Sequence, residues 1–147
     1  MKAKKAFVII NESHSLFQEQ ESMLQERFDE IEFIKAPAVG WTLEEMLDVA
    51  VNLHFRASEA DVIRKDGKVV SIHYPGQTEN AVVFASPIPF MLKYLAKRSI
   101  RAEYLGDHAE ESELYKVLVF HNDKREKKEL PDGRIIQTVA ATGWQLI

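Results

Sequence analysis

The fold class of this chain follows from a stretch near its C-terminal end, VLVFHNDKRE at residues 117–126. Its first four residues are a continuous apolar run, which is typical of a strand buried in a parallel sheet. The other six can donate hydrogen bonds, accept protons and carry positive charge. Because ligands of open α/β sheets gather beyond the carboxyl ends of strands, this polar segment is a candidate binding site. The alternative is a solvated strand end that leads into a charged hairpin, since charge runs usually face water.

Three similar apolar runs precede this one, at residues 7–10, 31–34 and 81–85. Between the runs we predict helices, which cover residues near 16–28, 43–54 and 87–97. Their start signals are a capping box at Ser15–Gln18, a second at Thr42–Glu45, and Ser86 as N-cap with Pro87 at the first helical position. This alternation predicts an α/β fold: a Rossmann-like, mainly parallel sheet with helices on both faces, in one domain over residues 1–147.

Two Asp-Gly pairs, at residues 66–67 and 132–133, predict β-hairpin appendages on this domain. The first hairpin is expected as an insertion over about 62–73, and the second as a C-terminal hairpin over about 124–139. Residues 100–105 are predicted to form a short strand, and the acidic segment 106–113 a loop or a helical turn.

The composition excludes several classes of function. With 147 residues, a net charge of −4 and no cysteine, the chain offers no general polycation for duplex nucleic acid, no disulfide and no thiolate metal site. The histidines show no metal-ligand spacing, so we expect no metal and no cofactor. The chain contains no apolar run long enough to span a membrane, and the lack of cysteine suits a reducing, cytoplasmic location.

The turn after the first strand carries Asn11, Ser13 and His14 just before a predicted helix N-terminus. Free backbone N–H groups there attract anions, and histidine is the side chain best suited to proton transfer near neutral pH. The alternative is a capped helix start with an exposed histidine. Ser86 occupies the same position after the third strand and either contacts a phosphate or serves only as an N-cap. Trp41, in the loop after the second strand, either stacks on a base or seals the core edge.

Three pieces of the sequence resemble a group of small CRISPR-associated proteins, compact relatives of the CRISPR-associated Rossmann-fold (CARF) domains. The first is an apolar strand followed by NESHSLFQEQ at residues 11–20, and the second is Trp41 beyond the second strand. The third is FHNDKRE at residues 120–126 before an Asp-Gly hairpin. The chain departs from the family at residues 85–89, where Ala-Ser-Pro-Ile-Pro replaces a glycine-bearing loop.

The resemblance implies binding and metal-independent cleavage of cyclic oligoadenylate, as in a standalone ring nuclease that switches off type III antiviral signalling. It also implies a homodimer, because a ring-shaped ligand suits a site across a two-fold axis. We expect His14 or His121 to take the ribose 2′-OH proton and Lys124 to stabilise phosphate charge. The expected ligand-binding residues are Asn11, Ser13, Trp41, Ser86, Asn122 and Arg125.

Two alternatives to an enzyme remain open at the level of the sequence. The same pocket would also serve a non-catalytic nucleotide sensor that acts through a partner. A Rossmann-like interaction module without a nucleotide ligand would need neither histidine. Cleavage of the messenger separates the first two, and failure to bind any oligoadenylate favours the third.

Overall fold

A computed structural model describes residues 4–147, apart from the side chains at positions 103 and 105. Its centre is a five-stranded sheet in which four strands run parallel. In spatial order the strands are β11 (Gln145–Leu146), β8 (Lys116–His121), β5 (Ala81–Phe84), β1 (Lys5–Asn11) and β2 (Glu30–Ala36). The four predicted apolar runs form the parallel strands, which confirms that part of the sequence analysis. β11, which pairs antiparallel with β8, was not predicted.

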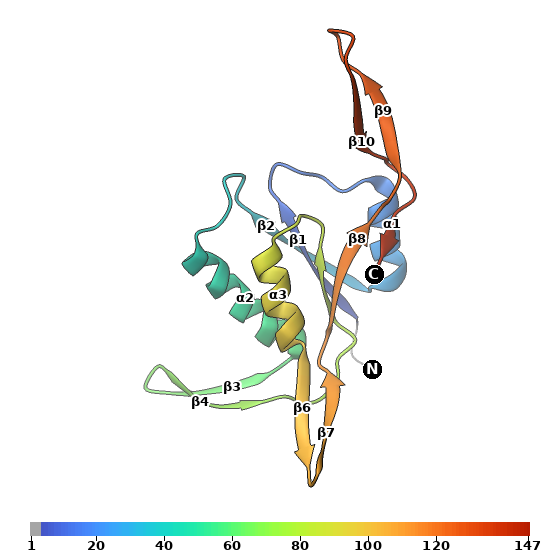
Figure 1. Cartoon of the computed structure of the whole chain (residues 1–147). Coiled ribbons are helices and arrows are strands. Elements are labelled where there is room, and N and C mark those ends of the chain that lie inside the picture. The colour runs from blue at the N-terminus through green and yellow to red at the C-terminus, as the bar shows by residue number, and fades with distance from the viewer. Residues whose placement is uncertain (1–3) are drawn as a thin grey trace.

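Helices cover both faces of this sheet (Figure 1). α2 (Leu43–Ser58) and α3 (Pro89–Arg98) pack against each other and bury one face, where Leu53 and Leu95 meet Phe7 and Phe84. α1 (Gln18–Arg27) covers the other face, where Leu24 packs with strand residues that include Val8 and Val83. Burial on both faces explains why the central strands are continuous apolar runs rather than alternating ones.

The start of α2 agrees with the sequence prediction, and the starts of the other two helices correct it. The Thr42 side chain accepts a hydrogen bond from the Glu45 N–H at 3.2 Å, and the Glu45 side chain accepts one from the Thr42 N–H. α1 begins at Gln18, and Phe17 rather than Ser15 is its N-cap. The Gln20 side chain accepts a hydrogen bond from the Phe17 N–H at this helix start. α3 begins at Pro89, two residues later than predicted.

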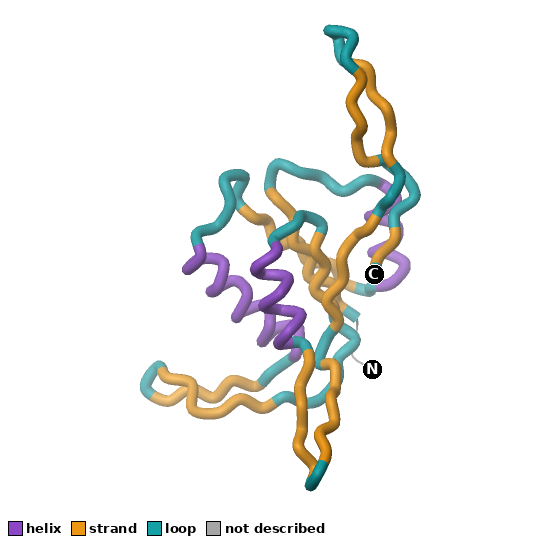
Figure 2. Tube along the Cα trace, in the orientation of Figure 1, coloured by secondary structure: helices purple, strands orange, loops and turns teal. Residues whose placement is uncertain are grey.

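Three antiparallel hairpins project from the sheet (Figure 2). They are β3–β4 (Asp61–Lys65 and Lys68–His73), β6–β7 (Ile100–Leu105 and His108–Glu113) and β9–β10 (Arg125–Glu129 and Ile135–Val139). In β3–β4 the predicted turn forms, with positive φ at Asp66 (54°) and Gly67 (76°) as a type I′ turn requires. The prediction of a loop or helical turn over residues 106–113 is wrong, because β7 pairs along the whole of β6 around a Gly106–Asp107 turn.

An ion-pair group fastens α2 to the edge strand β2. The Arg56 guanidinium donates two hydrogen bonds to the Glu32 carboxylate, at 2.6 and 2.7 Å, and Lys5 Nζ lies 3.1 Å from the same carboxylate. The Arg56 contact, and then Lys5, lowers the pKa of Glu32 to about 2. Within residues 4–147, no helix is long and apolar enough to cross a membrane.

Candidate functional site

The sheet has one point at which consecutive connections leave in opposite directions. From β1 the chain crosses to β2 on one side, and it later returns to β5 on the other side of β1. The loops after β1 and β5 therefore diverge at the carboxyl edge of the sheet, and this is where ligands of open α/β sheets bind. Residues 11–14 and residues 85–88 occupy these two loops.

Ser86 and Asn11 join the two loops. Ser86 is buried, and its Oγ accepts a hydrogen bond from the backbone N–H of Asn11 at 2.8 Å. This contact explains the late start of α3, since the hydroxyl predicted to cap that helix faces β1 instead. The Asn11 side-chain oxygen accepts hydrogen bonds from Ser13 N–H (2.9 Å) and Ser13 Oγ (2.6 Å), which tightens the turn.

The β2–α2 loop forms the third wall. Asn11 Nδ2 donates to the Pro37 carbonyl at 3.3 Å, and the Ala38 N–H donates to Glu12 Oε1 at 2.9 Å. These contacts hold the loop beside the β1–α1 turn and bring the half-buried Trp41 to the crevice. The resulting cavity has a volume of about 440 Å³ and is lined by Asn11, His14, Trp41 and Ser86, among others.

His14 lies at the mouth of this cavity, with an exposed side chain. Its Nδ1 lies 3.3 Å from Ser86 Oγ, and within the described residues Nε2 has no hydrogen-bond partner. Two tautomers fit this contact. When Nδ1–H donates to Ser86, Nε2 carries a lone pair that can accept a proton from a ligand. When Ser86 donates to Nδ1, Nε2–H is a donor. Ser86 therefore positions the ring for either role.

The predicted residues after β8 gather elsewhere on the same edge. His121 ends β8 opposite Gln145 of β11. Asn122 is buried, and its amide donates to the carbonyls of Ala140 (3.3 Å) and Thr142 (2.8 Å) while accepting from the Lys124 N–H (2.9 Å).

The two cations of this segment also contact the protein itself. Arg125 Nη1 donates to the backbone carbonyls of Asn122 (2.7 Å) and Lys124 (2.9 Å). The aliphatic part of Lys124 lies over Gly143, where a Cβ would come within 2.8 Å of Lys124 Cδ. Neither cation lines the cavity that holds His14, and neither do Ser13, His121 or Asn122.

The C-terminal segment connects this group to α1. Glu19, in the first turn of α1, accepts hydrogen bonds from the N–H groups of Gly143 (2.9 Å) and Trp144 (2.8 Å). The Trp144 ring stacks on Phe17 at 5.9 Å between centroids and meets Phe120 edge-on at 6.2 Å. Trp144 is thus a packing residue. Its buried Nε1–H has no hydrogen-bond partner within residues 4–147.

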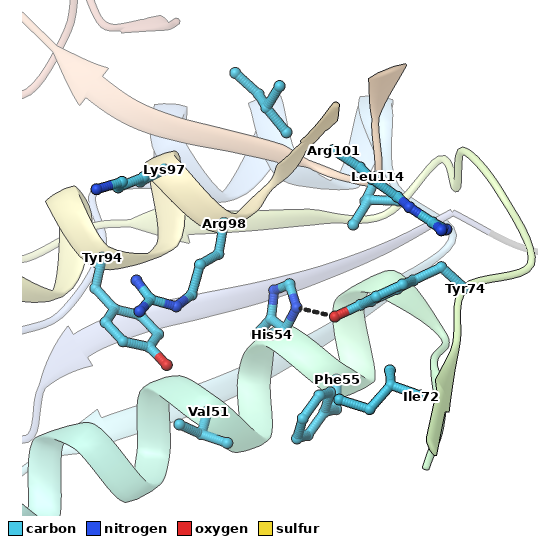
Figure 3. Close-up of a pocket in the computed structure, with 11 residues that line it drawn as sticks. Val51, His54, Phe55, Ile72, Tyr74, Tyr94, Lys97, Arg98, Arg101 and Leu114 are labelled. Atoms are coloured by element: carbon cyan, nitrogen blue, oxygen red, sulfur yellow. Dashed lines mark hydrogen bonds between the residues drawn. The ribbon is translucent and has the colours of Figure 1, made fainter. Parts of the chain in front are cut away.

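A second polar group, at the opposite edge of the sheet, was not predicted. His54 is buried, and its ring nitrogens contact the hydroxyls of Tyr115 (Nδ1, 2.9 Å) and Tyr74 (Nε2, 2.8 Å; Figure 3). Burial, and then the positive charge of Arg98, lowers the pKa of His54, and burial raises the pKa of both tyrosines. By its spacing in the sequence, His54 falls on the apolar face of α2. Its partners come from distant segments, so no local pattern could reveal them.

Compared with known proteins, the chain matches no family model, no curated protein and no solved structure. Across the described part of the chain, no group of three or more His, Asp or Glu side chains is arranged to hold a metal ion.

Proposed function

We propose that this chain is a Rossmann-like, CRISPR-associated protein that binds cyclic oligoadenylate at the carboxyl edge of its sheet and cleaves it without a metal ion. The observation that carries the proposal is the crevice between the ends of β1 and β5. There Asn11, His14, Trp41 and Ser86, which come from three separate loops, line one cavity. His14 can act as a base and Trp41 offers an aromatic ring for stacking, and both are groups that a site for cleaving an RNA-like ligand uses.

The proposed reaction is an internal transesterification. The ribose 2′-oxygen attacks the phosphorus of the neighbouring 3′-phosphodiester, and the bond from phosphorus to the 5′-oxygen breaks. The products are a 2′,3′-cyclic phosphate and a 5′-hydroxyl. In this scheme His14 Nε2 accepts the 2′-OH proton, while a proton from water or from a second catalytic group reaches the 5′-oxygen. Alignment of the attacking oxygen with the leaving oxygen supplies much of the rate.

In this proposal Ser86 is a positioning residue. His14 can use Nε2 as a base only in the tautomer whose Nδ1–H donates to Ser86 Oγ, which lies 3.3 Å away. Lys124 follows the carboxyl end of β8 on the same edge of the sheet but outside this cavity, so the ring must extend to it for its charge to offset that of the phosphate.

Binding a cyclic oligoadenylate also requires a second copy of the chain. A cavity of about 440 Å³ is smaller than a cyclic oligoadenylate, so we propose that a homodimer joins two such cavities across a two-fold axis. The projecting hairpin β3–β4 supports this, because two-stranded hairpins with exposed apolar side chains are marginally stable alone. Ile63 and Val70 on this hairpin are 54% and 59% exposed.

A non-catalytic nucleotide sensor is the second candidate. It is favoured by the lining of the cavity, in which none of the described residues is a lysine or arginine. A site without a cation close to the phosphate would bind the ring without stabilising the charge that develops during cleavage.

The test mixes the purified protein with cyclic tri-, tetra- and hexa-adenylate in EDTA and identifies the products by mass. Binding is followed separately by fluorescence in a Trp144→Phe background, which leaves Trp41 as the reporter. We expect His14→Ala to slow single-turnover cleavage by about 10²–10⁴-fold with little effect on affinity. We expect Lys124→Ala and Arg125→Ala to weaken binding, whereas Lys93→Ala on α3 should change neither property.

The outcomes separate the candidates. Binding without products favours the sensor. Equal cleavage by His14→Ala and the parent, with loss of cleavage in His121→Ala, would move the base to the end of β8. Failure to bind any of the three rings would overturn both candidates.

A further inference from the structure

A larger cavity lies at the amino edge of the sheet, away from the crevice described above. Its volume is about 560 Å³, within the range of small-molecule sites. Its walls come from the C-terminal halves of α2 and α3, from β4 and β6, and from the residues that precede β5 and β8 (Figure 3). Nothing in the proposed cleavage reaction uses this cavity.

One side of the cavity is positively charged. Lys97 and Arg98, in the last turn of α3, and Arg101, on β6, line it. None of the described residues in its lining is acidic. The two α3 cations also suit the negative end of a helix dipole, but Arg101 belongs to a strand and has no such role. In a chain with a net charge of −4, three cations around one cavity form a local anion-attracting patch.

Aromatic rings hold two of these cations in place. The Arg98 guanidinium carbon lies 3.6 Å from the centre of the Tyr94 ring, and that of Arg101 lies 5.4 Å from the centre of the Tyr74 ring. For Arg98, stacking on the ring face leaves the edge of the guanidinium able to form in-plane hydrogen bonds to an anion. Because the rings restrict these side chains, less conformational entropy is lost on binding.

The other side of the cavity is apolar. Val51 and Phe55 of α2 and Ile72 of β4 lie across from the cations (Figure 3). Val51 and Ile72 are 37% and 40% exposed, so a ligand would bury apolar surface that now faces water. A cavity with one positively charged side and one apolar side favours a ligand that carries both a negative charge and an apolar surface.

His54 lies between the two sides and controls one further donor. Its ring nitrogens contact Tyr115 and Tyr74, so a neutral ring donates to one hydroxyl and accepts from the other. If Nε2–H donates to Tyr74, the Tyr74 hydroxyl hydrogen is free to donate to an anion. An anion therefore favours one direction of the chain from Tyr115 through His54 to Tyr74.

We propose that this cavity binds a small amphipathic organic anion, which carries one phosphate, sulfonate or carboxylate group on a flat apolar body. The anionic group contacts Arg98 and the Tyr74 hydroxyl, Lys97 adds positive charge at the rim, and the apolar body packs on Val51, Phe55 and Ile72. Such a ligand joins β4 and β6, at the bases of two projecting hairpins, to helices α2 and α3.

The test compares two fluorescent probes with nearly the same aromatic body. One is 8-anilinonaphthalene-1-sulfonate, which is an anion, and the other is N-phenyl-1-naphthylamine, which is neutral. We expect saturable binding of the sulfonate, at least about 10-fold tighter than that of the neutral probe, because charge-assisted hydrogen bonds are roughly twice as strong as neutral ones. Excess 1-naphthyl phosphate should displace the sulfonate, whereas 1-naphthol at the same concentration should not.

Variants locate the binding site. Arg98→Gln should weaken sulfonate binding about 10-fold, and Lys97→Gln by less. Lys93→Gln, one turn earlier on α3 and outside the cavity, is the matched control and should bind like the parent. Tyr74→Phe keeps the ring and removes the hydroxyl. It should therefore lower the affinity for the anionic sulfonate and leave the affinity for the neutral probe unchanged. In the parent, ¹⁵N shifts of the His54 ring should move toward the Nε2–H tautomer when the sulfonate binds.

Equal affinity for the two probes would overturn the proposal, as would an equal loss in Lys97→Gln and Lys93→Gln. Unchanged sulfonate binding in a folded Arg98→Gln variant would overturn it as well. These results are independent of oligoadenylate cleavage, which takes place at the other edge of the sheet.

Discussion

His54 is a buried histidine whose ring nitrogens both contact tyrosine hydroxyls, and its protonation opposes folding. Burial, and then the charge of Arg98, lowers its pKa from the usual 6.5, so the unfolded chain takes up a proton first as the pH falls. The stability that depends on neutral His54 is complete above the unfolded pKa. It declines as the pH drops below that value toward the folded pKa.

We therefore expect the free energy of unfolding to decrease between pH 6.5 and pH 5, by up to about 1.4 kcal/mol per pH unit from this one proton. His54→Gln should lower stability at pH 7 and flatten this slope. Urea unfolding at half-unit pH intervals measures both effects. His108→Gln, at an exposed histidine of β7, is the control and should keep the parent's slope. An unchanged slope in His54→Gln would contradict this explanation.

At the scale of elements, Asn122 holds the C-terminal segment against the end of β8. Its amide makes three hydrogen bonds to backbone groups, of Lys124, Ala140 and Thr142, and the residue is 6% exposed. Asn122→Ala leaves these groups without their partner, so we expect a loss of about 2–3 kcal/mol in the free energy of unfolding. Hydrogen exchange should also become faster over residues 140–147, while α2 and α3 keep their protection.

Asn52→Ala is the matched control for this prediction. Asn52 is an exposed residue of α2, and alanine has the higher helix propensity, so this change should leave stability equal or slightly raised. If Asn122→Ala lowered the free energy of unfolding no more than Asn52→Ala does, the contacts of Asn122 would not be what holds residues 140–147 in place.

The elements that the sequence predicted are those whose signals are local. The buried strands follow from apolar runs, and α2 follows from its 3.6-residue period and the Thr42–Glu45 capping box. β7 was missed because HAEESE, residues 108–113, has no apolar residue beyond one alanine; backbone pairing with β6 forms the strand instead. The start of α3 was misplaced because a tertiary contact, Asn11 N–H to Ser86 Oγ, uses the expected cap.

The same distinction applies to the two sites. The crevice at β1 and β5 could be located from sequence, because strand ends and helix starts mark it. The group around His54 joins residues of α2, β6 and the segments before β5 and β8, and only the folded chain brings these together.

At the scale of the whole molecule, charge is distributed unevenly between opposite ends. The β6–β7 hairpin points away from the sheet in the direction opposite to β9–β10 (Figure 1). Residues 107–113 carry four carboxylates, at Asp107, Glu110, Glu111 and Glu113, and no lysine or arginine. β9 carries Arg125, Lys127 and Lys128 against two glutamates, all exposed. Side by side and antiparallel, two copies would place β7 of each near β9 of the other. Such a dimer holds the two His14 cavities at opposite ends, so it is an alternative to the dimer that joins them around one ring.

We expect a homodimer of this kind to have a charge-dependent interface. Its dissociation constant should increase between 50 and 500 mM salt, because the screening length for exposed ion pairs falls from about 14 Å to about 4 Å over this range. Glu111→Lys alone and Lys127→Glu alone should each weaken the dimer, and the double variant should recover most of the loss, since it restores opposite charges across the interface.

Sedimentation at micromolar concentration measures the mass of the parent, of the two single variants and of the double variant. Asp48→Lys, an equal charge change on the exposed side of α2, should leave the mass of the dimer unchanged. A monomer at every salt concentration would contradict the dimer itself, whereas a dimer indifferent to both charge reversals would contradict the antiparallel arrangement.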